Sequence, residues 1–162
     1  MKKFLFFFSV IFALIASHLV ADPKLIKKNL KVMIHQIQTH FQNVRHLTID
    51  EARQLKSPII LDVRSKKERD ISVIPNSQSL DSSQGLDPKK PVLVYCTIGY
   101  RSSLHVQKLT KKGFDAFNLE GGILSWAHAG GNLLTTEGKP TKMVHTYGPL
   151  WNLLPEGYQG VH

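Results

Sequence analysis

Apolar residues recur at spacings of three and four between residues 24 and 41, and most lysines of this stretch fall between them. The apolar positions are Ile26, Leu30, Met33, Ile37 and Phe41. This period is typical of an amphipathic helix, and Pro23 suits the first position of a helix. We therefore expect an N-terminal helical segment over residues 22–43 that packs on the domain after it. Binding to a membrane surface is the alternative use of such a helix.

Beyond residue 43 the pattern changes to short apolar runs separated by turn residues. The runs 59–63 and 92–95 are almost continuously apolar, which is typical of strands buried on both faces. Further strands are predicted at 44–47, 77–80 and 114–119, and helices at 48–55, 65–69, 101–112 and from 121 onward. Strands that alternate with helices predict an α/β domain over residues 44–133, with a mostly parallel central sheet and helices on both faces.

Residues 134–162 are rich in glycine and proline, which favour turns. Large apolar residues are interspersed among them, namely Trp151, Leu153, Leu154 and Tyr158. We therefore expect a C-terminal extension that packs on the domain, and its sequence indicates no chemistry.

Residues 1–21 have the pattern of a targeting segment. Two lysines precede a nearly unbroken apolar run from Phe4 to Ala16, and Ala21 stands before the polar Asp22. This order predicts a secretory signal peptide cleaved after Ala21. An uncleaved anchor is the alternative, because the run approaches the ~20 residues that span a bilayer. We expect an exported protein, periplasmic or secreted, that contacts a membrane only if the segment is uncleaved.

Composition excludes several classes of protein. The 162 residues suit one domain of ordinary size with an extension. The one cysteine, Cys96, excludes an intrachain disulfide and a cysteine-rich zinc site, and the dispersed histidines favour no metal. We expect no cofactor.

The formal net charge is +9, or +7 without Lys2 and Lys3 of the targeting segment. A positive charge favours anionic partners in general. The basic residues are scattered rather than gathered in a stripe between aromatic residues, so we expect no nucleic-acid partner.

Cys96 directly follows the apolar run 92–95, and the segment from Cys96 to Arg101 joins this strand to the next helix. Ligands of open α/β sheets bind at the carboxyl ends of strands. The free N–H groups at a helix N-terminus favour an anion and a reactive thiolate. Gly99 permits a backbone conformation that other residues resist, and Arg101 adds positive charge. These features favour a functional cysteine; a cysteine buried as a small hydrophobic residue is the alternative.

Three segments resemble the rhodanese-like sulfurtransferases. Residues 95–102 (Tyr-Cys-Thr-Ile-Gly-Tyr-Arg-Ser) resemble the active-site loop of that family. Residues 61–64 (Leu-Asp-Val-Arg), with Glu68 shortly after, resemble its strand signature, and residues 118–130 resemble its closing motif. The segments stand in the family's order and spacing, so the resemblance implies the rhodanese fold.

The resemblance also implies a mechanism and a set of site residues. The Cys96 thiolate would attack the outer sulfur of thiosulfate or a similar small anion and hold that sulfur as a persulfide. Arg101 would assist it, and backbone N–H groups of the loop would bind the donor. The substrate-binding positions are Thr97, Ile98, Gly99 and Tyr100; Asp62 and Arg64 would brace the loop without touching substrate. A second, external partner is required as acceptor, cyanide or a thiol, because residues 1–162 hold no second cysteine.

Three alternatives use the same loop. A phosphatase of related fold has one more residue between cysteine and arginine, and this loop also lacks a nearby Asp or Glu to act as acid. A non-catalytic exported module would bind an anion or a persulfide without turnover. A thiol oxidoreductase would need a resolving cysteine.

Overall fold

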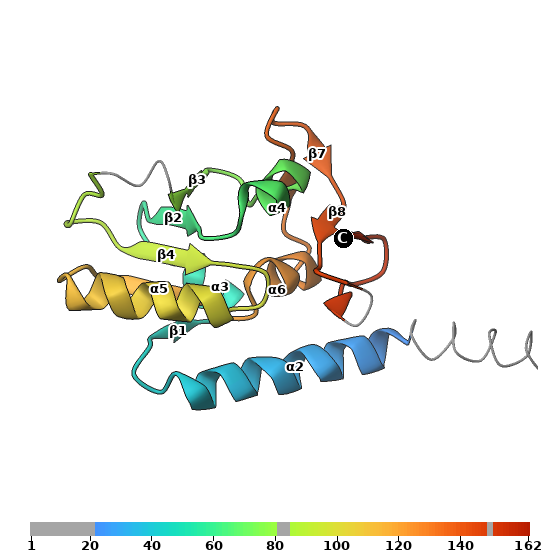
Figure 1. Ribbon diagram of the computed structural model, residues 1–162, viewed down its shortest axis with the longest axis horizontal. Coiled ribbons are helices and arrows are strands. Elements are labelled where there is room, and N and C mark those ends of the chain that lie inside the picture. The colour runs from blue at the N-terminus through green and yellow to red at the C-terminus, as the bar shows by residue number, and fades with distance from the viewer. Residues whose placement is uncertain (1–21, 81–84, 149–150) are drawn as a thin grey trace, which may run out of the picture.

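The computed structural model describes residues 22–80, 85–148 and 151–162 (Figure 1). The targeting segment expected at residues 1–21 lies outside the described residues. Among the helices of the described ranges, none has the length and hydropathy needed to cross a membrane.

Within the described residues, five parallel strands form the central sheet. Their order is β1 (His46–Leu47), β5 (Ala116–Leu119), β4 (Val92–Tyr95), β2 (Ile59–Asp62) and β3 (Ser77–Ser79). The prediction of an α/β fold on a parallel sheet is therefore confirmed. Because β4 lies in the middle of the sheet, the segment that follows it emerges at the centre of the carboxyl edge.

Both faces of β4 are buried, which explains its continuously apolar sequence. Val92 and Val94 pack with α5 (Tyr100–Lys111) in one hydrophobic cluster. Leu93 and Tyr95 belong to a second cluster, shared with α2 (Pro23–His40), α3 (Ile49–Ala52) and α6 (Gly122–His128). Successive side chains of a strand point to opposite faces, so helices on both sides demand an apolar residue at every position.

Capping boxes open the two short helices before the central strand. Thr48 and Glu51 cap α3, and Ser65 and Glu68 cap α4 (Lys66–Ile71). The helix expected through residue 55 ends at Ala52, because the following N–H groups of Gln54 and Leu55 bond to carbonyls three residues back, at 3.0 and 3.3 Å, in a tighter turn than an α-helix. Similarly, the strand expected at 44–47 pairs only over β1.

The N-terminal helix α2 lies along one side of the domain (Figure 1). Its Leu30 and Ile34 are buried in the larger cluster. The exposed side of the first half of α2 is basic, with Lys24, Lys27, Lys28 and Lys31.

Residues 133–148 and 151–162 fold over the end of the molecule toward which β4 points (Figure 1). β6 (Leu133–Leu134) pairs with β7 (Pro140–Thr141), and β8 (Met143–His145) pairs with β9 (Gln159–Val161). Val144, Leu153 and Leu154 join the larger cluster. The C-terminal extension is therefore packed beside the carboxyl edge of the sheet, where Cys96 lies.

Candidate active site

Cys96 stands at the first position after β4 and is 1% exposed. Its sulfur accepts hydrogen bonds from the Gly99 N–H at 3.1 Å and from the Ser102 hydroxyl at 3.4 Å. Gly99 has a φ of 114°, a conformation that side chains resist, and this conformation aims its N–H at the sulfur. Two hydrogen-bond donors therefore converge on the sulfur, the atom that would act as nucleophile.

The N-terminus of α6 donates backbone hydrogen bonds to the cysteine loop. The Ile123 N–H donates to the Cys96 carbonyl at 3.0 Å, and the Leu124 N–H donates to the Thr97 carbonyl at 3.3 Å. A Cβ at Gly122 would lie 2.2 Å from the Cys96 carbonyl oxygen, so only glycine permits this approach. The closing motif therefore supports the loop directly.

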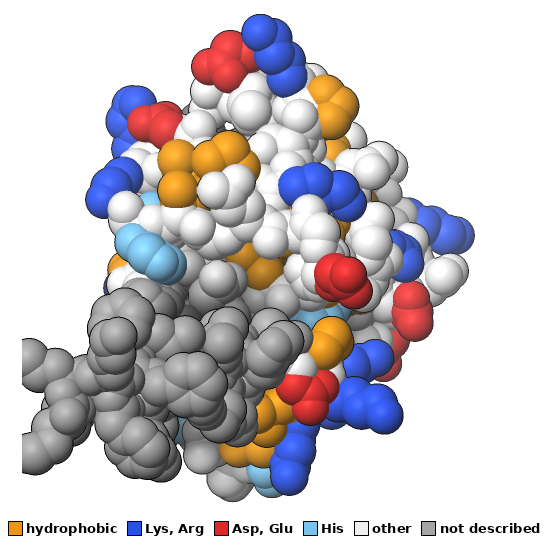
Figure 2. Space-filling view, turned by 90° about the vertical axis from the view of Figure 1, so that its right-hand side faces the viewer, with side chains coloured by type: hydrophobic (Ala, Val, Ile, Leu, Met, Phe, Trp, Pro, Cys, Tyr) orange, Lys and Arg blue, Asp and Glu red, His pale blue; other side chains and the backbone are white. Residues whose placement is uncertain are grey.

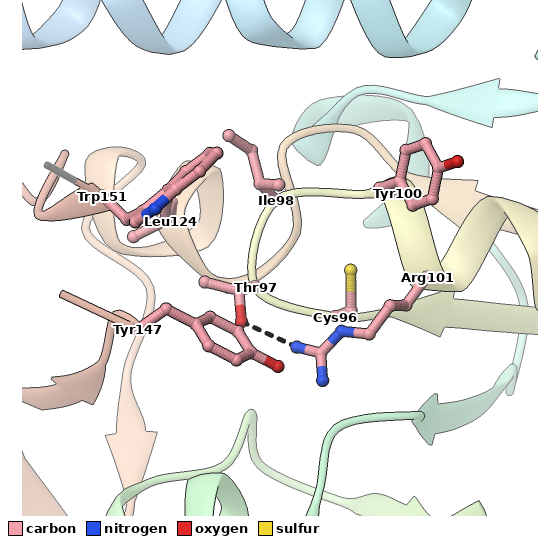
Figure 3. A pocket seen from close by; sticks show the side chains of 8 residues that line it. All are labelled: Cys96, Thr97, Ile98, Tyr100, Arg101, Leu124, Tyr147 and Trp151. Atoms are coloured by element: carbon pink, nitrogen blue, oxygen red, sulfur yellow. Dashed lines mark hydrogen bonds between the residues drawn. The ribbon is translucent and has the colours of Figure 1, made fainter. Parts of the chain in front are cut away.

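A buried carboxylate, Glu68, closes the other side of the loop. Arg101 binds it with Nη1 at 2.8 Å and Nη2 at 2.7 Å, and the Thr97 hydroxyl donates to it at 3.0 Å. Nη2 of Arg101 also donates to the Thr97 hydroxyl at 3.1 Å, the dashed line in Figure 3. These bonds join the start of the loop to the start of α5 and fix its curvature.

The Glu68–Arg101 pair is ionised on both sides. Burial raises the pKa of Glu68, but hydrogen bonds from Arg101 and Ser65 outweigh it and hold the pKa well below its usual range. Burial lowers the pKa of Arg101, yet the bond to Glu68 raises it above its ordinary value. Arg101 brings the positive charge expected from the sequence, and the Glu68 carboxylate offsets that charge.

The expectation that no Asp or Glu lies near the loop is wrong. Glu68 stands 28 positions before Cys96 in the chain, and the α4 turn brings it into contact with Thr97. Its depressed pKa keeps it ionised, so it holds no proton to donate as the acid of phosphate hydrolysis.

Asp62 and Arg64 form a buried ion pair beneath the sheet edge, with 2.6 Å between Arg64 Nη2 and Asp62 Oδ2. The Tyr95 hydroxyl donates to Asp62 at 2.5 Å, and Arg64 donates to the Ser72 carbonyl at 2.6 Å. Neither residue lines the pocket described next. Their contact to the loop runs through Tyr95, which directly precedes Cys96.

A pocket of about 460 Å³ opens over the cysteine (Figure 3). Its wall is formed by the cysteine loop with the start of α5, by α6 and by the C-terminal extension. The lining residues are Cys96, Thr97, Ile98, Tyr100, Arg101, Leu124, Tyr147 and Trp151. Of the predicted site residues, Gly99 contacts the sulfur through its N–H without lining the pocket.

The C-terminal extension contributes to the site, which the sequence did not predict. The Tyr147 hydroxyl donates to Glu68 at 3.1 Å, and its ring lies 5.0 Å from the Arg101 guanidinium carbon. Trp151 also lines the pocket and lies on the same side of it as Tyr147 in Figure 3. The sequence signal was weak, aromatic residues among turn formers, with no spacing to connect them to the loop. The contact of Ser102 with the sulfur was also missed.

Among the described residues, neither a charged patch on the face shown in Figure 2 nor a metal site accompanies the pocket. On the coloured part of the face in Figure 2, basic and acidic side chains are interspersed, without a patch of one sign. Among residues 22–80, 85–148 and 151–162, no group of three or more His, Cys, Asp or Glu residues is arranged to hold a metal ion.

Comparisons with known proteins agree with this geometry. Residues 48–129 match the model of the rhodanese-like domain. The thiosulfate sulfurtransferase GlpE of Coxiella burnetii is 31% identical over 93 residues, which cover 53% of this chain and 87% of that protein. The tRNA sulfurtransferase of Desulfurococcus amylolyticus is 40% identical over 67 residues, 40% of this chain but 14% of that much longer protein.

Solved structures show the same fold. A rhodanese-related protein from Thermoplasma volcanium has a TM-score of 0.50 and 28% identity, covering 56% of this chain and 97% of that one. The thiosulfate sulfurtransferase from Pseudomonas aeruginosa has a TM-score of 0.55 and 22% identity, covering 68% of this chain and 23% of that one. This chain belongs to the rhodanese-like domain family and has sulfurtransferases among its homologues.

Proposed function

We propose that this chain is a sulfurtransferase that takes a sulfane sulfur from thiosulfate or a similar anion and carries it as a Cys96 persulfide. The observation that carries the proposal is the environment of the Cys96 sulfur. It opens into a pocket and accepts hydrogen bonds from the Gly99 N–H and the Ser102 hydroxyl, at 3.1 and 3.4 Å. The likeness to thiosulfate sulfurtransferase GlpE supports the choice of donor.

In the first half-reaction, the Cys96 thiolate attacks the outer sulfur of thiosulfate. A bond forms between the two sulfurs, the S–S bond of thiosulfate breaks, and sulfite leaves with its electron pair. Backbone N–H groups from Thr97 to Arg101 surround the transferred sulfur, as donors surround the charge in an oxyanion hole. Covalent capture divides one difficult transfer into two easier steps.

In the second half-reaction, a thiophilic acceptor attacks the outer sulfur of the persulfide, and the Cys96 thiolate leaves. The acceptor is a separate molecule, cyanide or a thiol, because Cys96 is the one cysteine of the chain. The pair of Glu68 and Arg101 keeps the loop curved through both steps by its bonds to Thr97. Asp62 and Arg64 hold the end of β4 through Tyr95.

We further propose that the protein works outside the cytoplasm. The basic start and apolar run of residues 1–21 support export. The test is the N-terminal residue of the protein recovered from cells. Asp22 at the N-terminus supports a cleaved signal; Met1 in a membrane fraction supports an uncleaved anchor.

The test of the reaction is the intact mass of the purified protein after thiosulfate, with Cys96→Ser alongside. We expect the mass of one added sulfur on the wild type alone, and its loss to thiocyanate when cyanide is added. Folded protein that gains no sulfur and yields no thiocyanate would refute thiosulfate transfer. It would favour the alternative of a module that binds an anion or persulfide without turnover.

A further inference from the structure

The wall of the pocket opposite the cysteine loop lies outside the part of the chain that matches the family model. Tyr147 and Trp151 line the pocket, but the match to the rhodanese-like domain ends at residue 129. Both residues stay largely open to solvent, at 55% and 48% exposure. Two half-exposed aromatic side chains beside a reactive cysteine present an apolar surface that a ligand can cover.

The pocket is larger and more apolar than a small oxyanion needs. Its volume of about 460 Å³ falls within the range of about 300–1,000 Å³ found for small organic ligands. Ile98, Leu124 and Trp151 make its apolar side. A neighbouring groove of about 300 Å³ shares Ile98, Tyr100 and Trp151 with the pocket and runs to α2, so the apolar surface continues away from the sulfur.

The polar side of the pocket carries little net charge. Arg101 is the cation among the lining residues, and Glu68 binds it through two hydrogen bonds. The Tyr147 hydroxyl donates to the same carboxylate, and its ring stacks near the guanidinium. An arginine paired with a carboxylate stabilises a doubly charged donor less than an unpaired arginine would, because the carboxylate repels the second negative charge of the donor.

We propose that Trp151, with Tyr147 beside it, is a specificity-determining residue that makes a singly charged organic thiosulfonate with an aromatic group a better sulfur donor than thiosulfate. This inference rests on the sulfurtransferase function proposed above. The aromatic group covers Trp151 and Leu124, while the R–SO₂–S⁻ end reaches the N–H groups around Cys96. Trp151 contacts the donor; Tyr147 is a positioning residue that orients Arg101 and Glu68.

The transfer balances without any further reagent. The Cys96 thiolate attacks the terminal sulfur of R–SO₂–S⁻, and a new S–S bond forms. The bond between the terminal sulfur and the sulfonyl sulfur breaks, and the sulfinate R–SO₂⁻ leaves with the electron pair. The charge is the same before and after, and no oxidant or reductant takes part.

The test compares three donors with cyanide as acceptor: benzenethiosulfonate, methanethiosulfonate and thiosulfate. The two thiosulfonates share the reacting group and differ only in R. We expect kcat/KM of the wild type to be about tenfold higher for the benzene compound than for the methane compound, since an aromatic ring gains from stacking and burial. The difference should lie mainly in KM. Thiosulfate should have the lowest kcat/KM of the three.

Substitutions of Trp151 test whether this residue causes the preference for the aromatic donor. In Trp151→Ala, the benzene-to-methane ratio should fall to about two or less, whereas Trp151→Phe should retain most of it because the ring remains. Leu104→Ala is the matched control. It removes an exposed apolar side chain of α5 that does not line the pocket, and it should keep the wild-type ratio.

Distinct results would overturn this inference and the proposed function. A wild-type ratio near one, or a high ratio that persists in Trp151→Ala, would refute the role of Trp151 even if thiosulfate loads Cys96. Thiosulfate as the best of the three donors would refute the preference for an organic monoanion. If none of the three donors transfers sulfur to Cys96, the sulfurtransferase function itself is refuted.

Discussion

Glu68 connects four parts of the molecule through one buried carboxylate. In the capping box of α4 its side chain accepts a hydrogen bond from the Ser65 N–H at 2.9 Å. It also receives bonds from Thr97 in the cysteine loop, Arg101 in α5 and Tyr147 in the C-terminal extension. A carboxylate with so many donors stays charged at 1% exposure, because the hydrogen bonds replace the lost water.

Glu68→Gln tests this role. The neutral amide leaves the partly buried Arg101 without its counter-charge, so we expect the free energy of unfolding to fall by about 2 kcal/mol, the size of a hydrogen bond to a charged group. Urea unfolding at pH 7 measures the loss. Glu156→Gln is the control, since Glu156 is exposed and surface changes usually stay within ~0.5 kcal/mol. Equal stability of the two variants would contradict the role.

At the scale of elements, the unit of β4, the cysteine loop and α5 positions the reactive sulfur and its hydrogen-bond donors. β4 ends in the middle of the sheet, α5 begins at Tyr100, and between them the chain turns tightly enough for the Gly99 N–H to face the Cys96 sulfur. The start of α6 then binds the carbonyls of Cys96 and Thr97. Hydrogen bonds from both helices thus hold a short loop that would otherwise be mobile.

Gly99→Ala tests the geometry of this unit. The φ of 114° strains any side chain, and a Cβ there would meet the Asn118 amide at 3.3 Å. We expect the loop to relax, the N–H to leave the sulfur, and the rate of persulfide formation from thiosulfate to fall more than tenfold.

Gly113→Ala is the matched control for backbone strain. Gly113 follows the end of α5 with a φ of 85° and has open space around a Cβ. The Gly113→Ala variant should lose ~1 kcal/mol of stability from backbone strain, as Gly99→Ala should. Its rate of persulfide formation should stay at the wild-type value. A normal rate in Gly99→Ala would show that the donor bond to sulfur is unimportant.

At the scale of the whole molecule, the C-terminal extension completes the pocket and depends on its own packing. His145 in β8 is 7% exposed, and its Nδ1 accepts the Tyr147 N–H at 3.4 Å. The imidazole also contacts the Tyr147 ring edge-on. The position of Tyr147 over Arg101 therefore depends on a neutral His145.

This dependence predicts a loss of stability in mild acid. Burial lowers the pKa of His145, and Lys67, Arg64 and His162 lower it further against the opposite effect of Glu68. Above the ordinary value of 6.5 the ring is neutral in the folded and the unfolded chain. Below it the unfolded chain binds the proton first, so stability falls as pH decreases from 6.5.

Thermal unfolding at pH 7.5 and at pH 5.5 measures this loss. His145→Asn should show a smaller difference between the two pH values than the wild type, because the titrating group is absent. His35→Asn, at an exposed position of α2, should behave like the wild type. An unchanged pH dependence in His145→Asn would refute the coupling.

Much of the fold was predictable because its signals are local. The continuous apolar run of β4, the capping boxes at Thr48 and Ser65, and the apolar spacing of α2 each depend on neighbours within a few residues. Pairing and register were not predictable in this way. The shortening of β1 and α3 also depends on where the chain must turn to reach the sheet.

By itself the sequence determined the α/β class, the position of Cys96 after a buried strand and the glycine that shapes its loop, because hydrophobic period and backbone freedom act over short distances. Only the tertiary structure decided what surrounds the cysteine. Glu68, Leu124, Tyr147 and Trp151 come from α4, α6 and the extension. Long-range packing brings them together, and with them come the compensation of the Arg101 charge and the apolar wall. No pattern of neighbouring residues encodes such contacts.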